Sequence, residues 1–268
     1  MKIAVAQLVV SHDKQRNLDK ALTYIVWAKA EKANFIVFPE AFMSLMSINT
    51  TIKHADIAES IDGPFVKTLA AAAKKHKIYI IFGIYESKFG EQERSYNTII
   101  FLNDEGQLIH SYRKTHLYDA FCYNESWNII PGDNGFTPVK TKLGTIGILV
   151  CYELRFPEIS RTLALQGADI LIVPTAWING VMKEEHLLTL SQARAVENTV
   201  FVCIANQVGN DYAGCSSIYN PMGIIMSSKS KDEGLIFADI DIDQIHACRE
   251  QLPCLRQRLP KLYKLDYD

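Results

Sequence analysis

Short apolar runs alternate with longer amphipathic stretches along nearly the whole chain, and this alternation limits the possible fold more than any other feature. Residues 78–84 form a near-continuous apolar run, typical of a strand buried on both faces. Residues 17–33 instead carry apolar side chains at helical spacing, at positions 18, 22 and 25. Further strands are predicted at 3–10, 34–38, 98–102, 107–112, 145–150, 169–173, 200–205, 217–219, 224–227 and 235–240, and further helices at 64–77, 157–166 and 183–198. This order predicts a mixed α/β fold with helices covering the sheet faces.

The domain organisation follows from length and composition. The chain has 268 residues, 48% of them hydrophobic, which is enough for a large core. No low-complexity linker or break in composition separates two domains, so we expect one domain over residues 1–252. Residues 253–268 differ, and we predict that they form an extended arm contacting a second subunit. Its apolar side chains are Leu255, Leu259, Leu262 and Tyr263.

Charge and hydropathy narrow the range of partners. The formal net charge is -2, so no global attraction to nucleic acid or to an anionic membrane is expected. No apolar run approaches the roughly 18 residues that a membrane span needs. The apolar N-terminal residues 1–10 lead directly into a polar stretch and are interpreted as a first strand, not as a signal peptide.

The six cysteines show no C-x-x-C pair and no zinc-like clustering with histidine. Without an export signal, they are interpreted as reduced thiols in a cytoplasmic protein. The seven histidines form no H-x-x-H or H-E-x-x-H motif, so neither a metal site nor another cofactor is expected.

Cys151 occupies the most informative position in the chain. It ends the apolar run 145–150 and is followed by charged residues, with Pro157 where a helix could begin. Ligands meet α/β proteins at strand ends, where the next helix presents free N–H groups. We therefore expect a partly exposed thiol with a pKa lowered toward the thiolate, in contrast to an inert buried cysteine.

Two further charged residues come directly after predicted strands. Glu40 follows the apolar strand 34–38, and a partly desolvated carboxylate there could act as a general base. Lys114 follows the strand 107–112, where an ammonium could stabilise an oxyanion. Glu125 lies among aromatic residues in a loop-like stretch. Each of the three, taken alone, could be a solvated surface residue.

Together, these motifs resemble the nitrilase superfamily of carbon–nitrogen hydrolases over essentially the whole chain. The matching stretches are Phe38-Pro39-Glu40, Arg113-Lys114-Thr115-His116-Leu117, residues 151–158, Gly167-Ala168-Asp169-Ile170-Leu171 with Pro174-Thr175-Ala176-Trp177, residues 193–198 and Asn220-Pro221-Met222-Gly223. The resemblance implies a four-layer α-β-β-α sandwich that pairs into a homodimer or higher homo-oligomer. It also implies hydrolysis of non-peptide C–N bonds without a cofactor.

The resemblance also assigns roles to individual residues. Cys151 would be the nucleophile, and Glu40 would accept its proton and later protonate the leaving ammonia. Lys114 and the backbone N–H of Tyr152 would hold the oxyanion of the tetrahedral intermediate. Glu125 matches a second glutamate that would orient Lys114 and the substrate.

The residues after Cys151 are similar to those of amidases acting on small carboxamides, including omega-amidases and deaminated-glutathione amidases. Trp177, Thr175, Ala176 and Arg155 are assigned to substrate binding, and Arg155 could bind a substrate carboxylate. An ion pair of Arg155 with Glu153 or Glu158 remains the structural alternative.

Other functions stay open at this point. The substrate could be an N-carbamoyl amide or a nitrile, or the chain could be a catalytically silent interaction module of this fold. A Cys–His hydrolase would use His116, the only histidine near a candidate site, but would leave the positions of Glu40 and Lys114 unexplained.

Overall fold

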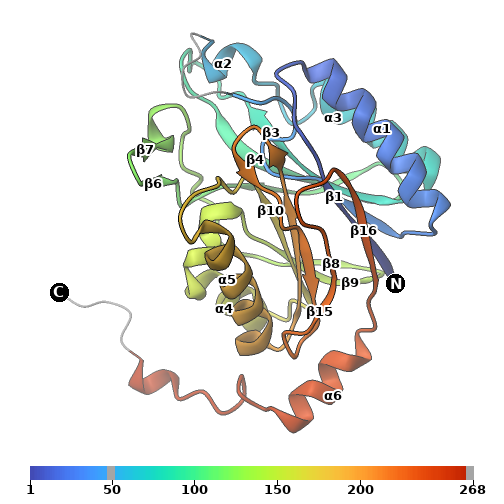
Figure 1. The fold of residues 1–268 in the computed structure, drawn as a ribbon, viewed down its shortest axis with the longest axis vertical. Coiled ribbons are helices and arrows are strands. Elements are labelled where there is room, and N and C mark those ends of the chain that lie inside the picture. The colour runs from blue at the N-terminus through green and yellow to red at the C-terminus, as the bar shows by residue number, and fades with distance from the viewer. Residues whose placement is uncertain (47–51, 264–268) are drawn as a thin grey trace.

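The computed structural model describes residues 1–46 and 52–263, and its centre consists of two six-stranded sheets (Figure 1). The first sheet has the order β16-β1-β2-β3-β4-β5 and the second β15-β14-β11-β10-β9-β8. The strands of the first are β1 (Lys2–Gln7), β2 (Phe35–Val37), β3 (Tyr79–Glu86), β4 (Tyr96–Leu102), β5 (Leu108–Arg113) and β16 (Gly234–Asp239). Those of the second are β8 (Val139–Thr141), β9 (Gly144–Ile148), β10 (Ile170–Thr175), β11 (Phe201–Asn206), β14 (Ser217–Tyr219) and β15 (Ile225–Ser228).

Helices cover the outer face of each sheet. Figure 1 shows α1 (Lys14–Ala30) and α3 (Pro64–His76) on one side of the strands, and α4 (Pro157–Leu165) and α5 (Lys183–Asn198) on the other. Alternate residues of one strand belong to different cores: Ala4 packs in the cluster that contains α1 and α3, whereas Val5 packs in the cluster between the sheets. The predicted four-layer α-β-β-α sandwich is therefore confirmed.

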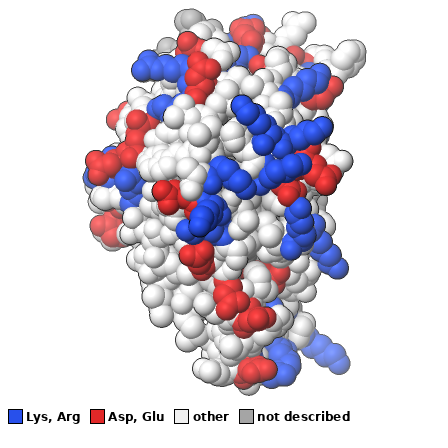
Figure 2. Space-filling view, turned by 90° about the vertical axis from the view of Figure 1, so that its right-hand side faces the viewer, with Lys and Arg blue, Asp and Glu red and all other residues white. Residues whose placement is uncertain are grey.

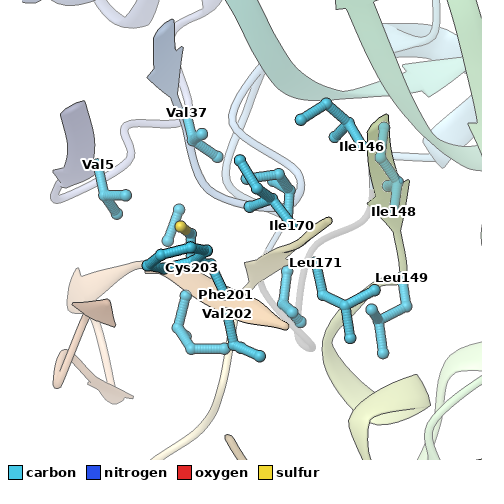
Figure 3. Packing of buried hydrophobic residues seen from close by; sticks show 14 of the residues in the cluster. Val5, Val37, Ile146, Ile148, Leu149, Ile170, Leu171, Phe201, Val202 and Cys203 are labelled. Carbon is cyan, nitrogen blue, oxygen red and sulfur yellow. The ribbon is translucent and has the colours of Figure 1, made fainter. Parts of the chain in front are cut away.

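The interface between the two sheets is apolar. In Figure 3, Val5 and Val37 of the first sheet point toward side chains of the second, including Ile170 and Cys203. All four side chains have no solvent exposure. This packing fixes the two sheets against each other, which lets residues from both contribute to one site.

Parallel strands at the centre of each sheet bring several chain segments to the same edge. β1, β2 and β3 run parallel, as do β9, β10 and β11. A parallel bridge between Leu8 and Gln207 joins the two sheets just past the ends of β1 and β11. The segments that follow β2, β9 and β10 consequently leave the sheets at neighbouring places.

Shorter elements complete the chain. They are α2 (His54–Ile57), α6 (Asp243–Gln251), the hairpin of β6 (Asp119–Ala120) and β7 (Tyr123–Asn124), the pair β12 (Val208–Gly209) and β13 (Tyr212–Ala213), and the 3-10 helices Glu125–Trp127, Cys151–Arg155 and Pro260–Leu262. No helix was predicted at α6, because only Ile245 and Cys248 of this helix are buried and its apolar pattern is weak. Of the predicted arm 253–268, residues 264–268 lie outside the described residues.

The surface agrees with the mixed charge of the sequence. Figure 2 shows basic and acidic side chains intermixed on the face that it displays. Among the described residues, no helix is both long and apolar enough to cross a membrane.

Candidate active site

Cys151 lies three residues past the end of β9, as the first residue of a 3-10 helix. Its φ angle is +48°, in the left-handed region that a non-glycine residue rarely adopts. Such a conformation costs on the order of 1–3 kcal/mol and occurs preferentially at functional sites. The side chain is 8% exposed, so the thiol is buried and not partly exposed as the sequence suggested.

The expectation of a lowered thiol pKa is wrong. Burial raises the pKa of Cys151 well above its ordinary value, and the negative charge of Glu40 raises it further. The charge of Lys114 and a hydrogen bond from the backbone of Ala176 act in the opposite direction without compensating. The resting thiol is therefore protonated at neutral pH, and any nucleophilic role requires a base. Glu40 lines the same cavity as this thiol and can supply that base.

Glu40 is held at the sheet edge by close backbone packing. The chain passes over Gly83 of β3, where an added Cβ would stand 2.5 Å from the Ala41 nitrogen and 3.0 Å from the Glu40 carbonyl carbon. From the second sheet, the Gln207 side chain donates to the Glu40 carbonyl oxygen over 2.9 Å. Only glycine at position 83 leaves room for this path. Glu40 is 3% exposed.

Lys114 pairs with two buried carboxylates. Its Nζ lies 2.9 Å from Oε1 of Glu40 and 2.8 Å from Oε2 of Glu125. Burial alone would lower the pKa of Lys114, but the charges of Glu125 and Glu40 outweigh burial and raise it well above its ordinary value. Lys114 therefore remains a cation in a site from which water is largely excluded.

The two carboxylates have an additional partner that the sequence interpretation missed. Nδ2 of Asn97 donates to Glu40 over 2.7 Å and to Glu125 over 3.3 Å. The backbone N–H of Tyr118 donates to Glu125 over 2.7 Å, and that of Ala176 donates to Glu40 over 2.8 Å. Asn97 directly precedes the predicted strand 98–102, and a polar side chain at that position is the signal that could have identified it.

Hydrogen bonds to the Glu153 side chain link the turn that contains Cys151 to the segment that contains Lys114. Its Oε1 accepts hydrogen bonds from the Tyr112 hydroxyl, from the N–H and hydroxyl of Thr115 and from the N–H of His116, while Oε2 accepts from the N–H of Val150. The side chain has no solvent exposure. A carboxylate with this many donors can stay ionised without a cationic partner.

This use of Glu153 also corrects the structural alternative for Arg155. Within the described part of the chain, Arg155 forms no ion pair with Glu153 or Glu158. Its guanidinium carbon instead stands 4.7 Å from the ring centroid of Trp177.

A cavity brings most of the predicted site residues together. It encloses about 720 Å³ of empty space, part of which is open to solvent at the mouth. The predicted residues that line it are Glu40, Lys114, Glu125, Cys151, Tyr152, Arg155, Ala176 and Trp177. Thr175 is not one of the described residues at its wall, because its hydroxyl donates to Asn206 in the core over 2.7 Å. His116 is also absent from the described wall, and its ring packs against Phe156 at 4.2 Å between centroids.

The family model for carbon-nitrogen hydrolases matches residues 2–250. The chain belongs to the carbon–nitrogen hydrolase family. It is 30% identical to the deaminated glutathione amidase of Escherichia coli O157:H7, over 96% of this chain and 97% of that protein. It is 32% identical to the mouse omega-amidase NIT2, over 99% of this chain and 97% of that protein.

A solved structure supports the same assignment. This carbon–nitrogen hydrolase superposes on Saccharomyces cerevisiae Nit3, a member of branch 10 of the nitrilase superfamily, with a TM-score of 0.86 at 32% identity. The match covers 96% of each chain. The family resemblance and the sandwich fold predicted from the sequence are thereby confirmed.

Proposed function

We propose that this protein hydrolyses a small carboxamide to the acid and ammonia through an acyl-enzyme on Cys151. The observation that supports this most strongly is the Glu40–Lys114 pair beside the buried thiol in one cavity. These groups can supply a nucleophile, a base and a positive charge, the requirements of acyl transfer. Relatives named deaminated glutathione amidase and omega-amidase support the same reaction class.

The first half of the reaction forms the thioester. Glu40 accepts the thiol proton as the sulfur of Cys151 attacks the amide carbonyl carbon. The oxygen of the resulting tetrahedral intermediate carries the negative charge, and it binds Lys114 and the backbone N–H of Tyr152. Glu40 then gives its proton to the amide nitrogen, the C–N bond breaks, and ammonia leaves.

The second half releases the acid. Glu40 accepts a proton from water as the water oxygen attacks the thioester carbon, and the same two donors hold the oxyanion. Collapse of this intermediate breaks the C–S bond and returns the proton to the sulfur of Cys151. Glu125 keeps the Lys114 ammonium in place by accepting hydrogen bonds of 3.0 and 2.8 Å. Arg155 and Trp177 are assigned to binding the remainder of the substrate.

A panel of small amides, scored by ammonia release, tests this function. The panel includes an N-carbamoyl amide and a nitrile, so that other reactions of the superfamily are distinguished. The wild-type protein should release ammonia from at least one carboxamide, and Cys151→Ser should abolish the release while circular dichroism stays unchanged. Turnover confined to nitriles would refute the amidase assignment.

We further propose that the protein acts as a homodimer with α4 and α5 at the interface. Leu165 of α4 and Val196 of α5 are 47% and 39% exposed. On the predicted arm, Leu259, Leu262 and Tyr263 are also exposed. Contiguous exposed apolar surface generally marks a partner surface, and two-fold pairing is the commonest arrangement. Light scattering of the full chain should give a dimer, and removal of residues 253–268 should weaken it; a full-length monomer would refute the proposal.

We also propose a cytoplasmic location. All six cysteines are free thiols, and Cys203 and Cys248 are buried in the fold. Structural disulfides are typical of exported proteins of oxidising compartments, whereas free thiols are typical of reducing ones. Fractionation of cells that express the native chain tests this proposal.

A further inference from the structure

One wall of the cavity carries a buried histidine to which the proposed reaction assigns no role. His54 begins α2, which lies beside β3 (Figure 1), and it lines the same cavity as Glu40 and Cys151. The residue is only 8% exposed. A polar ring that is enclosed in this way needs a hydrogen-bond partner, either from the protein or from a ligand.

The protein supplies no such partner within its described residues. Nδ1 of His54 is buried without a hydrogen bond, and Nε2 forms none with the described part of the chain. Because Nδ1 is closed off, Nε2 is the nitrogen that can meet a molecule in the cavity. Burial lowers the pKa of His54 to about 4, so the ring is neutral at pH 7. A neutral imidazole suits an uncharged hydrogen-bonding group, since it carries one donor and one acceptor and no charge.

Tyr85 of β3 supplies a second uncharged polar group at this wall. Its ring meets that of His54 edge-on, with 4.7 Å between the ring centroids. Tyr85 is 6% exposed, and its hydroxyl forms no hydrogen bond with the residues that the structure describes. Burial raises the pKa of Tyr85 well above its ordinary value, and the charges of nearby groups, among them Glu40 and Glu125, raise it further. The hydroxyl is therefore protonated and can donate or accept a hydrogen bond.

Apolar side chains surround the two polar rings. Tyr85 packs with Ala41 and Ile129, and Met46 packs against this cluster. All three of these apolar residues also line the cavity. On such a background, a ligand is selected by where its polar atom lies, because a ligand without that atom leaves the His54 nitrogen unpaired.

We propose that His54 is a specificity-determining residue, which together with Tyr85 binds an uncharged hydrogen-bonding group on the acyl part of the substrate. The inference rests on the proposed amidase function, in which ammonia leaves and only the acyl part can extend to this wall. The substrate class that fits is a carboxamide whose acyl chain carries a hydroxyl or a second carboxamide. This group would give the His54 imidazole the partner that the protein does not supply.

Matched pairs of amides test the subsite by turnover. We compare 4-hydroxybutanamide with pentanamide, and 5-hydroxypentanamide with hexanamide, because a terminal hydroxyl replaces a methyl group in each pair. The ratio of kcat/KM for the hydroxylated amide to kcat/KM for its partner should fall about 3- to 30-fold in His54→Phe for at least one pair, through the loss of a hydrogen bond to a neutral group. General damage to the site would lower both values equally, so unchanged ratios in both pairs would refute the inference.

Two further variants complete this comparison. His54→Gln should recover part of the lost ratio, because its amide can form a hydrogen bond in place of Nε2. His246→Phe is the control for replacing a histidine by phenylalanine. His246 is exposed in α6 and lies outside the described wall of the cavity, so this variant should leave the ratios unchanged.

Thermal unfolding separates this role from packing. Phenylalanine keeps the edge-on contact with Tyr85 and removes a buried nitrogen that has no partner. The Tm of His54→Phe should therefore equal or exceed that of the wild type. A lower Tm with unchanged ratios would show that His54 is a structural residue, and would overturn the proposal.

Binding without turnover keeps this proposal distinct from the amidase proposal. Both hydroxylated amides are titrated into Cys151→Ala, and into the double variant that also carries His54→Phe, with binding followed by nuclear magnetic resonance. We expect Kd to rise about 3- to 30-fold in the double variant. Equal Kd values, or no binding of either amide to Cys151→Ala, would overturn the role of His54. If binding depends on His54 but the wild type hydrolyses no amide, the subsite stands and the amidase proposal falls.

Discussion

Glu153→Gln should destabilise the fold although the two side chains have the same shape. Glu153 accepts five hydrogen bonds from groups on two segments, with no solvent contact. Glutamine keeps one oxygen for the four donors at Oε1, but it places an NH₂ group 2.8 Å from the N–H of Val150. One buried donor loses its acceptor, and the remaining bonds lose the charge that strengthens them.

These two losses set the magnitude. An unsatisfied buried N–H costs about 1–3 kcal/mol, and weaker hydrogen bonds to a neutral acceptor add a similar amount. Burying the neutral amide costs less free energy than burying the carboxylate, which offsets part of this destabilisation. We expect the free energy of unfolding to fall by about 2–4 kcal/mol.

Urea unfolding followed by circular dichroism measures this change at pH 7, with Glu158→Gln as the control. Glu158 is exposed in the first turn of α4. Glu153→Gln should lower the urea concentration at the unfolding midpoint without changing the dependence of the unfolding free energy on urea. Equal stability of Glu153→Gln and Glu158→Gln would refute the view that Glu153 ties the Cys151 turn to the Lys114 segment.

At acid pH, the free energies of unfolding of wild type and Glu153→Gln should become more similar. Burial raises the pKa of Glu153, but hydrogen bonds, including those from His116, Tyr112 and Thr115, outweigh burial and lower it overall. The stability from this lowered pKa is fully present above about pH 4.3, the ordinary value for an unfolded glutamate, and is lost as the pH falls through the folded-state pKa. If the difference in unfolding free energy between the two proteins stays constant on acidification, it does not come from the lowered pKa of Glu153.

Three further substitutions test the site. Glu40→Gln should lower kcat for the best amide by about 10²–10⁴ with folding retained, and near-normal kcat would exclude Glu40 as the base. Lys114→Met should lower kcat by at least about 10²–10³, and full rescue at low pH would exclude the oxyanion role. Gly83→Ala should lower stability by about 1–3 kcal/mol and reduce kcat, because its Cβ meets the Glu40 backbone. Gly135→Ala is its control, since a Cβ there meets nothing within 4 Å, and equal effects of both would refute the argument.

The sequence predicted the sheets and main helices well because each has a strong local signal. Helix α5 was predicted with the bounds 183–198 that the structure has, and β3 was predicted from its continuous apolar run. The helix α6 and the short hairpins escaped prediction, because they bury few side chains and their patterns are weak.

The site was predictable as a set of residue types but not as a set of interactions. Glu40, Lys114 and Cys151 each follow a strand, so their proximity could be anticipated. The direction in which the thiol pKa shifts could not be anticipated, because it depends on how completely loops from both sheets bury Cys151.

The central claim is a covalent acyl group on Cys151, and peptide-mapping mass spectrometry tests it most directly. The wild-type chain is mixed with its best amide substrate, quenched in acid during steady-state turnover, digested and mapped. The account predicts one adduct whose mass equals the substrate minus ammonia, on the peptide that contains Cys151, and no adduct in Cys151→Ala. Continued ammonia release by Cys151→Ala, or an acyl group on any other residue, would contradict it.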